Sequence, residues 1–352
     1  MSSSSIKLLA RLRCKPMSTQ FATIPLAHSY PDLPGLVRRI EAWGFEMVGV
    51  PDAHWLWPDC YVTLTQCALN SRRLRMGTFV TNPLTRHPAV TAGAIASINE
   101  LSDGRAFLGI GTGDSAVYNV GLKAARLAEF REALEAIKGF YTGETRFQGK
   151  TVRQVWVKRP VPVYVCAEGP KTLQLAGELA DGVIVGSGLS PAVVQDAYAR
   201  IEAGAKAAGR KLDDLDIWFF AKTNVAETTQ AAVDEIRMAL AASANHAFRR
   251  TLEGKRIPAE LWESIEKLKA AYRPHEHELL GAERFHARMV DELGLKDYLA
   301  ERFAIAGTPQ DCIDQVERAA EAGVKKIFLG PLTGDPAQVL QTFAQQIMPR
   351  FQ

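Results

Sequence analysis

Residues Leu74–Asp114 read LRMGTFVTNPLTRHPAVTAGAIASINELSDGRAFLGIGTGD. This stretch holds an apolar run at Leu74–Val80, a helical pattern at Ala89–Leu101 that opens just after Pro88, and a second apolar run at Ala106–Ile110. A strand, a helix that begins after a proline and another strand make one βαβ unit, whose two strands run parallel. The stretch therefore predicts a parallel sheet.

The same alternation of strand and helix continues on both sides of this unit. A small hairpin is predicted at Thr145–Phe147 and Val152–Val157, around a Gln148-Gly149-Lys150 turn. Eight strands in this order fit a closed (β/α)8 TIM barrel better than an open sheet. The eight predicted strands are Phe21–Leu26, Glu46–Val50, Leu74–Val80, Ala106–Ile110, Val161–Cys166, Gly182–Val185, Leu215–Thr223 and Lys326–Leu329.

One barrel domain is predicted over residues 19–352, with a helical insertion after the seventh strand. The segment Thr228–Arg302 is too long for a simple loop and is rich in charged and helix-forming residues. We expect it to lie over the active face of the barrel rather than to form a second domain. Residues 1–18 are expected to be a flexible extension. The alternative is a transit peptide, which their Ser, Lys and Arg content resembles, although no apolar core or cleavage site follows.

Composition is that of an ordinary globular protein. The formal net charge of +3 is too balanced to indicate a nucleic-acid or anionic-membrane partner. No apolar run approaches the roughly 20 residues that span a bilayer. The five cysteines are scattered and form no CxxC pair, which is typical of a reduced, cytoplasmic protein.

Candidate catalytic residues follow the second and fourth strands, because the active site of such a barrel lies at the carboxyl ends of its strands. Asp52 and His54 stand one residue apart beside an aromatic side chain and are candidates for a proton-transfer pair. The alternative is a structural Asp and His in a loop. Thr112 and Gly113 end a G-x-G-x-G run after the fourth strand, and Asp114 follows it. That spacing differs from the G-x-G-x-x-G dinucleotide fingerprint and suits a ligand at a barrel mouth.

Candidate cofactor-binding residues follow the third, fifth and sixth strands. Phe79, Val80, Thr81 and Asn82 belong to a proline-rich loop whose rigid shape could recognise a ring face or a phosphate. In the two later units, small residues precede helix N-termini, where free N–H groups and the helix dipole suit a phosphate. The alternative is a pair of tight turns that need glycine for geometry alone. The residues concerned are Ala167, Glu168, Gly169, Gly186, Ser187 and Gly188.

A His-Glu-His-Glu run at residues 275–278 offers metal-ligating residue types. H-x-H spacing on a helix points the two rings apart. His275 and His277 are therefore expected on a solvated, charged face, and no metal site is predicted.

Several of these stretches resemble the bacterial-luciferase-like superfamily of flavin- or F-420-dependent oxidoreductases. The match covers most of the chain from about Thr19 onward, and the motifs look most like the methylenetetrahydromethanopterin reductase branch, which uses the deazaflavin coenzyme F-420. The matching stretches are Thr78–Pro88, Ile98–Arg105, Gly109–Asp114, Ala167–Leu173 and Ala176–Gly182.

The resemblance implies an oxidoreductase that holds FMN or coenzyme F-420 at the barrel mouth, with the ring against strand three and the phosphate near strands five and six. The reaction would be hydride transfer or monooxygenation of a small organic substrate, and a flavin enzyme of this kind would need a separate flavin reductase. The same analogy implies a homodimer. The alternative is a non-catalytic flavin-binding barrel.

The resemblance also carries expectations for single residues. It implies a cis peptide bond at Phe79–Val80. Asp114 matches an acidic position that serves as proton donor in some deazaflavin enzymes. Asp52 and His54 match a strand-two Asp-His pair, although this sequence places Ala53 between them.

Overall fold

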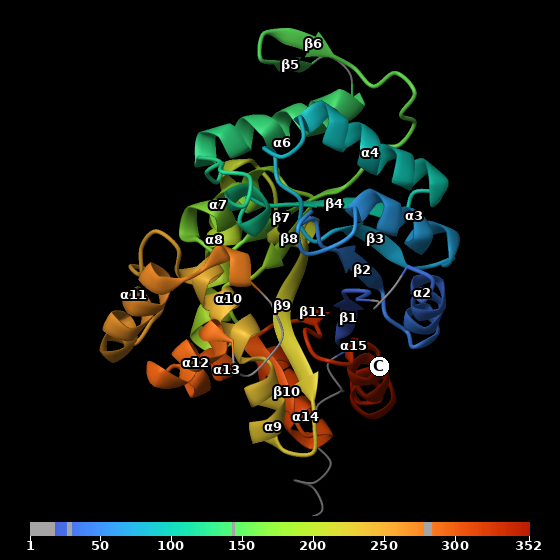
Figure 1. Ribbon diagram of the computed structural model, residues 1–352. Coiled ribbons are helices and arrows are strands. Elements are labelled where there is room, and N and C mark those ends of the chain that lie inside the picture. Colours follow the sequence, from blue (N-terminus) through green and yellow to red (C-terminus); the bar gives the residue numbers. More distant parts are fainter. Residues whose placement is uncertain (1–17, 27–29, 143–144, 278–283) are drawn as a thin grey trace, which may run out of the picture.

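In the computed structural model, eight parallel strands close into a barrel with helices around it (Figure 1). The structure describes residues 18–26, 30–142, 145–277 and 284–352, so the predicted N-terminal extension lies outside the described residues except for Ser18. Strand β9 pairs with both β8 and β11, and β1 pairs with both β11 and β2, which closes the barrel. The predicted (β/α)8 TIM barrel is confirmed. The barrel strands are β1 (Gln20–Thr23), β2 (Met47–Val50), β3 (Arg75–Thr78), β4 (Ala106–Ile110), β7 (Val163–Ala167), β8 (Gly182–Val185), β9 (Asp216–Val225) and β11 (Lys326–Gly330).

Proline marks the first turn of most helices that follow a barrel strand. Its fixed φ and missing N–H suit the first helical position and stop the preceding segment from continuing as a helix. Such prolines stand in six of the eight outer helices, namely α2, α4, α7, α8, α14 and α15. The outer helices are α2 (Leu33–Ala42), α3 (Cys60–Leu69), α4 (Pro88–Leu101), α6 (Leu127–Thr142), α7 (Pro170–Leu179), α8 (Pro191–Ala207), α14 (Pro309–Glu321) and α15 (Pro336–Thr342).

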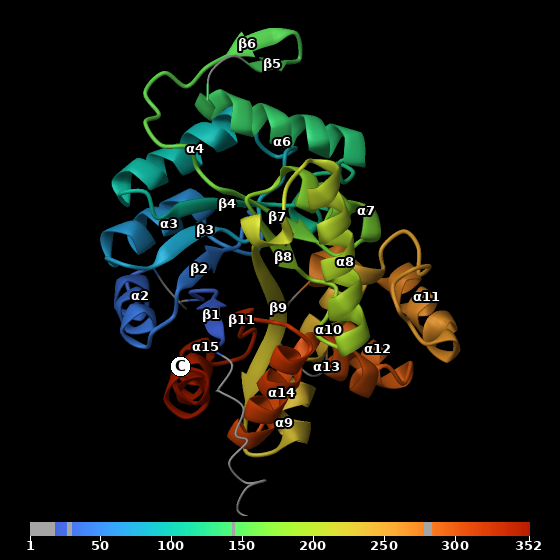
Figure 2. The same cartoon turned by 180° about the vertical axis from the view of Figure 1, so that it is seen from behind.

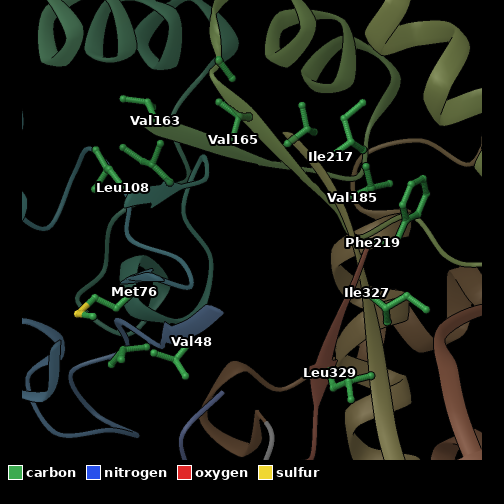
Figure 3. Packing of buried hydrophobic residues seen from close by; sticks show 14 of the residues in the cluster. Val48, Met76, Leu108, Val163, Val165, Val185, Ile217, Phe219, Ile327 and Leu329 are labelled. Carbon is green, nitrogen blue, oxygen red and sulfur yellow. The ribbon is translucent and has the colours of Figure 1, made fainter. Parts of the chain in front are cut away.

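Two hydrophobic layers follow from the alternation of side chains along each strand. The barrel interior is filled by large side chains such as Phe107, Tyr164 and Trp218. The other face of the strands packs against the outer helices. Figure 3 shows part of this second layer, which includes Leu108 and Val165.

Five helices connect β9 to a further strand, β10 (Ala304–Gly307). They are α9 (Thr229–Glu235), α10 (Arg237–Phe248), α11 (Trp262–Ala271), α12 (Phe285–Glu292) and α13 (Lys296–Phe303). Helices α10 to α13 gather on one side of the barrel in both views (Figures 1 and 2). Their apolar side chains form a cluster of their own that also takes in Ala304 and Ala306 of β10.

Strand β10 was not predicted from the sequence. It has only four residues, all buried, and it follows α13 with no turn residue between them, so no alternation of polar and apolar side chains marks it. Its partner is the carboxyl-terminal half of β9, outside the closed barrel.

The predicted hairpin exists, but its second strand was placed wrongly. Strands β5 (Thr145–Phe147) and β6 (Lys150–Val152) pair antiparallel, and residues 153–157 form no strand. Gln148 and Gly149 both have positive φ, at 50° and 74°. A two-residue turn with positive φ at both positions starts the return strand at Lys150. Figure 2 shows this hairpin beyond α4 and α6.

None of the helices in the described part of the chain is long and apolar enough to cross a membrane.

Candidate active site

A cavity of about 250 Å³ opens at the carboxyl ends of the strands. The loops after β2, β3, β4 and β7 form one wall, and the segment around α10 forms the other. Ten of the residues predicted from the sequence line it. They are Asp52, Phe79, Val80, Thr81, Asn82, Thr112, Gly113, Asp114, Glu168 and Gly169.

The peptide bond between Phe79 and Val80 is cis, as the family resemblance implied. Phe79 stacks on Phe328, with ring centroids 4.1 Å apart, and meets Phe220 edge-on. After this bond, the chain returns to the ladder beside β4, because Thr81 N–H donates to the carbonyl of Gly109 at 3.0 Å. The end of the third strand is therefore a firmly held apolar wall, formed at the cavity by Phe79 and Val80.

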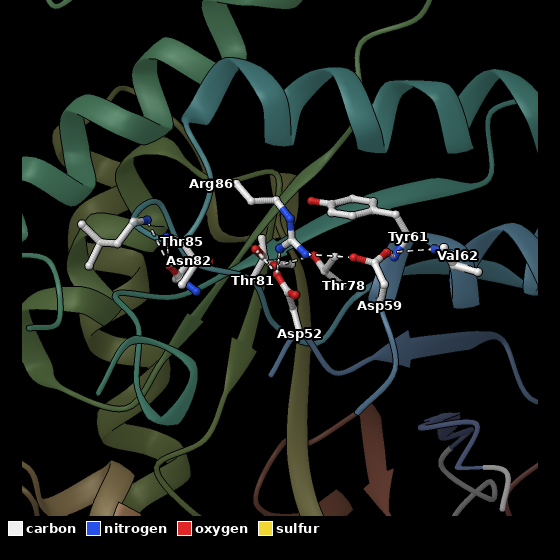
Figure 4. A network of polar contacts seen from close by, with 11 residues as sticks. Asp52, Asp59, Tyr61, Val62, Thr78, Thr81, Asn82, Thr85 and Arg86 are labelled. Atoms are coloured by element: carbon white, nitrogen blue, oxygen red, sulfur yellow. Dashed lines mark hydrogen bonds and ion pairs between the residues drawn. The ribbon is translucent and has the colours of Figure 1, made fainter. Parts of the chain in front are cut away.

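Asp52 is buried and anchors a polar network behind this wall (Figure 4). Its Oδ2 accepts hydrogen bonds from Thr81 Oγ1 at 2.6 Å and from Arg86 Nη1 at 2.5 Å. Arg86 also donates to Asp59 at 3.1 Å and lies over the ring of Tyr61. Asp52 thus ties the loop after β2 to the loop after β3, and its catalytic role stays a prediction.

His54 does not form the predicted pair with Asp52. Its side chain is exposed, and the residues of this loop that line the cavity include Ala53, Leu56 and Trp57 instead. The turn at residues 54–57, where Leu56 and Trp57 N–H donate to the carbonyl of Ala53, carries His54 outward. The structure therefore does not bring His54 to the cavity beside Asp52, and its role in proton transfer stays a prediction.

Asp114 lies in a cluster that joins the barrel to α10. His246 Nε2 lies 2.5 Å from Asp114 Oδ2, and Arg249 Nη1 donates to Asp114 Oδ1 at 2.9 Å. The same guanidinium donates to the carbonyl of Gly113 at 3.0 Å. His277 brings a ring nitrogen into the cluster, within 4.8 Å of the ligand atoms of Asp114 and His246.

The charges in this cluster shift the pKa values of Asp114 and His246 in opposite directions. Burial by itself would raise the pKa of Asp114, but the nearby charges of His246 and Arg249 and the hydrogen bond with His246 outweigh it, and the pKa lies well below its usual range. Burial by itself would lower the pKa of His246, but the Asp114 carboxylate raises it above its ordinary value. These shifts favour a carboxylate at Asp114 and an imidazolium at His246, and the role of Asp114 as proton donor stays a prediction.

The loop after β7 and the start of α7 form the floor of the cavity. Glu168, Gly169 and Thr172 line it. No side chain caps the N-terminus of α7. Pro170 has no N–H, and Thr172 and Leu173 N–H donate to the carbonyl of Gly169, which leaves the N–H of Lys171 for an anion. Ala167 belongs to β7, is fully buried and does not line the cavity.

The second predicted phosphate turn, Gly186, Ser187 and Gly188, is covered by Arg302 of α13. Arg302 Nε donates to the carbonyl of Ser187 at 2.9 Å, and a Cβ on Gly188 would lie 2.6 Å from Arg302 Cγ. None of the three residues lines the 250 Å³ cavity. Ser187 instead borders a smaller cavity together with Glu168, Lys255 and Arg302, and the phosphate-binding role of this turn stays a prediction.

The functional residues that sequence reasoning missed come from the insertion. His246, Arg249, Arg250 and Lys255 line the cavity, although no motif marks them in the sequence. His277 was noticed but placed on a solvated face; it is only 4% exposed. The short 3-10 turn Pro274–Glu276 just before it turns this ring inward.

Comparison with known proteins agrees with the family resemblance and with the barrel fold. The chain matches the family model described as luciferase-like monooxygenase over residues 4–326. A 5,10-methylenetetrahydromethanopterin reductase of Methanolobus tindarius is 31% identical over 326 residues, which cover 88% of this chain and 94% of that protein. An F420-dependent glucose-6-phosphate dehydrogenase of Amycolatopsis mediterranei is 28% identical, with 91% of this chain and 94% of that protein covered.

Among solved structures, a coenzyme F420-dependent tetrahydromethanopterin reductase from Methanopyrus kandleri has a TM-score of 0.71 at 25% identity, covering 96% of this chain and 100% of that one. An F420-dependent secondary alcohol dehydrogenase has a TM-score of 0.72 at 18% identity, which shows the shared fold. The chain belongs to the luciferase-like monooxygenase family of oxidoreductases.

Proposed function

We propose that this chain binds coenzyme F-420 in the cavity at the strand ends and transfers a hydride between that cofactor and a small organic substrate. The similar curated proteins are named as a methanopterin reductase and as an F420-dependent dehydrogenase. FMN is the alternative cofactor, with monooxygenation as the alternative reaction.

The observation that carries the proposal is an apolar wall and a charged cluster facing one cavity. Phe79 and Val80 supply the wall, while Asp114, His246 and Arg249 supply the charges. A planar, tricyclic ring needs an apolar surface to lie on, and its reaction needs a proton-bearing group nearby. When bound, the cofactor supplies the carbon that gives or accepts the hydride.

The backbone around the cavity fits such a group. Gly113 has a φ of +99°, and a Cβ there would lie 2.5 Å from Val117 Cγ2, so only glycine lets the chain turn close to a ligand. The N-terminus of α7 offers the N–H of Lys171 and the positive end of the helix dipole to a phosphate or a carboxylate.

Cationic side chains from the insertion favour a ligand with an anionic tail. Arg249, Arg250 and Lys255 all line the cavity. Arg250 Nη2 reaches the carbonyl of Ala125 at 3.5 Å, and Lys255 Nζ donates to the carbonyl of Arg249 at 2.8 Å. These contacts hold the positive groups at the rim, where an anionic tail would pass.

Separate titrations with F-420 and FMN test the proposal. Trp57 lines the cavity, so binding should quench protein fluorescence. We expect F-420 to bind at micromolar concentrations and FMN to bind more weakly. Arg249→Met should weaken F-420 binding, whereas the exposed Arg318→Met serves as a matched control and should not. Tight binding of FMN alone would replace the proposal by the flavin alternative, and binding of neither would refute it.

Further features stay predictions. We propose a cytoplasmic location, a homodimer and a single barrel domain at 19–352 with residues 228–302 as its insertion. A separate flavin reductase is expected only in the FMN case.

A further inference from the structure

We propose that His246 is the group that exchanges a proton with the substrate, and that His277 and Tyr272 link it to a separate side cavity from which the proton is replaced. This inference rests on the proposed function and deepens it. It assigns the proton step to residues of the insertion.

The geometry places three proton-bearing side chains in a row, with a ring nitrogen of His277 within 4.8 Å of the ligand atoms of His246 and Asp114, a gap that one water molecule can bridge. His246 Nε2 lies 2.5 Å from Asp114 Oδ2, and the His246 and His277 ring centroids are 5.2 Å apart. His277 Nδ1 lies 2.5 Å from the Tyr272 hydroxyl. Tyr272 is held in place by stacking on His286, with ring centroids 4.3 Å apart and an interplanar angle of 6°.

The two ends of this chain lie in different cavities. His246 and His277 both line the 250 Å³ cavity. His277 and Tyr272 also line a second cavity of about 100 Å³, together with Asp114, Tyr118, Asn245 and Lys269. Tyr118, Asn245 and Tyr272 are partly exposed, so this side cavity gives access to solvent. His277 stands at the boundary between the two.

The groups facing His246 keep it charged. Asp114 and, at longer range, Glu168 favour the imidazolium, while Arg249 opposes it. Arg249 is itself engaged by Asp114, the carbonyl of Gly113 and the Tyr118 hydroxyl. Because two cations hold Asp114 as a carboxylate, that residue acts as a positioning residue, orienting the imidazolium toward the cavity.

The proton balance is complete in the reductive direction. The substrate accepts a hydride at carbon from the reduced cofactor and a proton at oxygen or nitrogen from His246, which becomes neutral. His246 then takes a proton from His277 through a bridging water molecule, and His277 recovers it through Tyr272 from water in the side cavity. In the oxidative direction each transfer runs in reverse.

A metal ion bound by Asp114, His246 and His277 is the competing interpretation of this cluster. The direct contact between His246 and Asp114 fills the space between two of the three ligands. The Arg249 guanidinium, 2.9 Å from Asp114 Oδ1, would also repel a divalent cation. These contacts favour a proton on His246 over a metal ion at this cluster.

Nitrogen-15 NMR of histidine-labelled protein without cofactor is the first test. We expect His246 to remain doubly protonated above pH 6.5, the ordinary pKa of a histidine side chain. Asp114→Asn should make His246 lose its proton at lower pH. Tyr272→Phe should change the ring-nitrogen shifts of His277 and leave His275 unchanged. A neutral His246 at pH 6 to 7 would overturn the proposal.

Turnover of reduced F-420 with a quinone acceptor, menadione, is the second test. His246→Gln retains a donor to Asp114 but cannot carry a proton, so turnover should fall about 100-fold and lose its pH dependence. Added imidazole should restore part of the rate. Tyr272→Phe should raise the solvent isotope effect while F-420 affinity stays unchanged.

The outcomes separate the two hypotheses. If F-420 fails to bind the wild-type protein, the proposed function fails. If F-420 binds but His246→Gln keeps the wild-type rate and pH profile, the proposed proton relay through His246, His277 and Tyr272 is wrong and the proposed function stands. A stoichiometric bound metal whose removal abolishes turnover would also overturn the relay, in favour of a metal site.

Discussion

Arg86 joins two carboxylates of very different exposure next to the end of the third strand. The Asp52 side chain is 5% exposed, whereas that of Asp59 is 49% exposed. A charge pair in contact with water contributes little to stability, while a buried partner that loses its counter-ion is costly. The two ion pairs of Arg86, with Asp52 and with Asp59, should therefore contribute very different amounts to the free energy of unfolding.

Asp52→Asn should lower the free energy of unfolding by about 1–3 kcal/mol, because it leaves Arg86 and Thr81 without their charged acceptor. Urea denaturation measures this. Asp59→Asn is the matched control: Asn still caps α3, and the exposed pair contributes less than about 1 kcal/mol. Equal losses in both variants would contradict the argument.

Lys255 gives a prediction about pH. Burial lowers its pKa from 10.5 to about 8. Between these two values the unfolded chain holds the proton and the folded protein does not, so this residue makes stability rise with pH across that window. Lys255→Met should remove that rise. Urea unfolding at several pH values from 8 to 10 compares the two proteins, and parallel profiles would refute the prediction.

At the scale of elements, helices α7 and α8 touch through two glycines. A Cβ on Gly204 would lie 1.9 Å from the carbonyl oxygen of Gln174, and one on Gly177 would lie 2.0 Å from that of Ile201. These obstacles are backbone atoms, which cannot turn away as a side chain can. The close approach of the two helices therefore depends on both glycines.

Gly204→Ala should cost about 3 kcal/mol of unfolding free energy, because one helix must shift away from the other. Gly35→Ala in α2 is the control: its nearest neighbour is the end of the Arg39 side chain at 3.6 Å, and alanine is the better helix former. That variant should be neutral or more stable by up to about 1 kcal/mol. Thermal and urea unfolding of both variants measures the difference in unfolding free energy. A neutral Gly204→Ala variant would contradict the prediction.

At the scale of the whole molecule, the cavity lies between two parts of the chain that are far apart in sequence. The strand-end loops form most of one wall, and the insertion around α10 forms the other. Asp114 meets residues that follow it by more than 130 positions in sequence. A cofactor bound there would touch both the strand-end loops and the insertion. Binding should therefore stabilise the insertion against local opening.

Amide hydrogen exchange should detect that effect. Saturation with F-420 should slow exchange around residues 246–255, which line the cavity, and leave the β5–β6 hairpin unchanged, because no residue of that hairpin lines the cavity. Mass spectrometry of peptic peptides resolves both regions. Protection confined to the strand-end loops would show that the insertion takes no part in binding.

The sequence by itself determined the barrel and one wall of its site. Short apolar runs, prolines at helix starts and glycines after strands are local signals, and parallel strands in a closed barrel bring their carboxyl ends together. Asp52, the run from Phe79 to Asn82, and the run from Thr112 to Asp114 were placed at the cavity by this reasoning alone.

Only the tertiary structure decided the other wall. His246, Arg249 and His277 reach Asp114 because α10 and the turn before His277 pack over the barrel. The periodicity of polar and apolar residues along the chain does not predict such a long-range contact. The same packing covers Gly188 with Arg302. Local spacing determines which residues follow a strand, whereas burial and charge pairing across more than 100 residues determine which of them face the cavity and in which direction their pKa values shift.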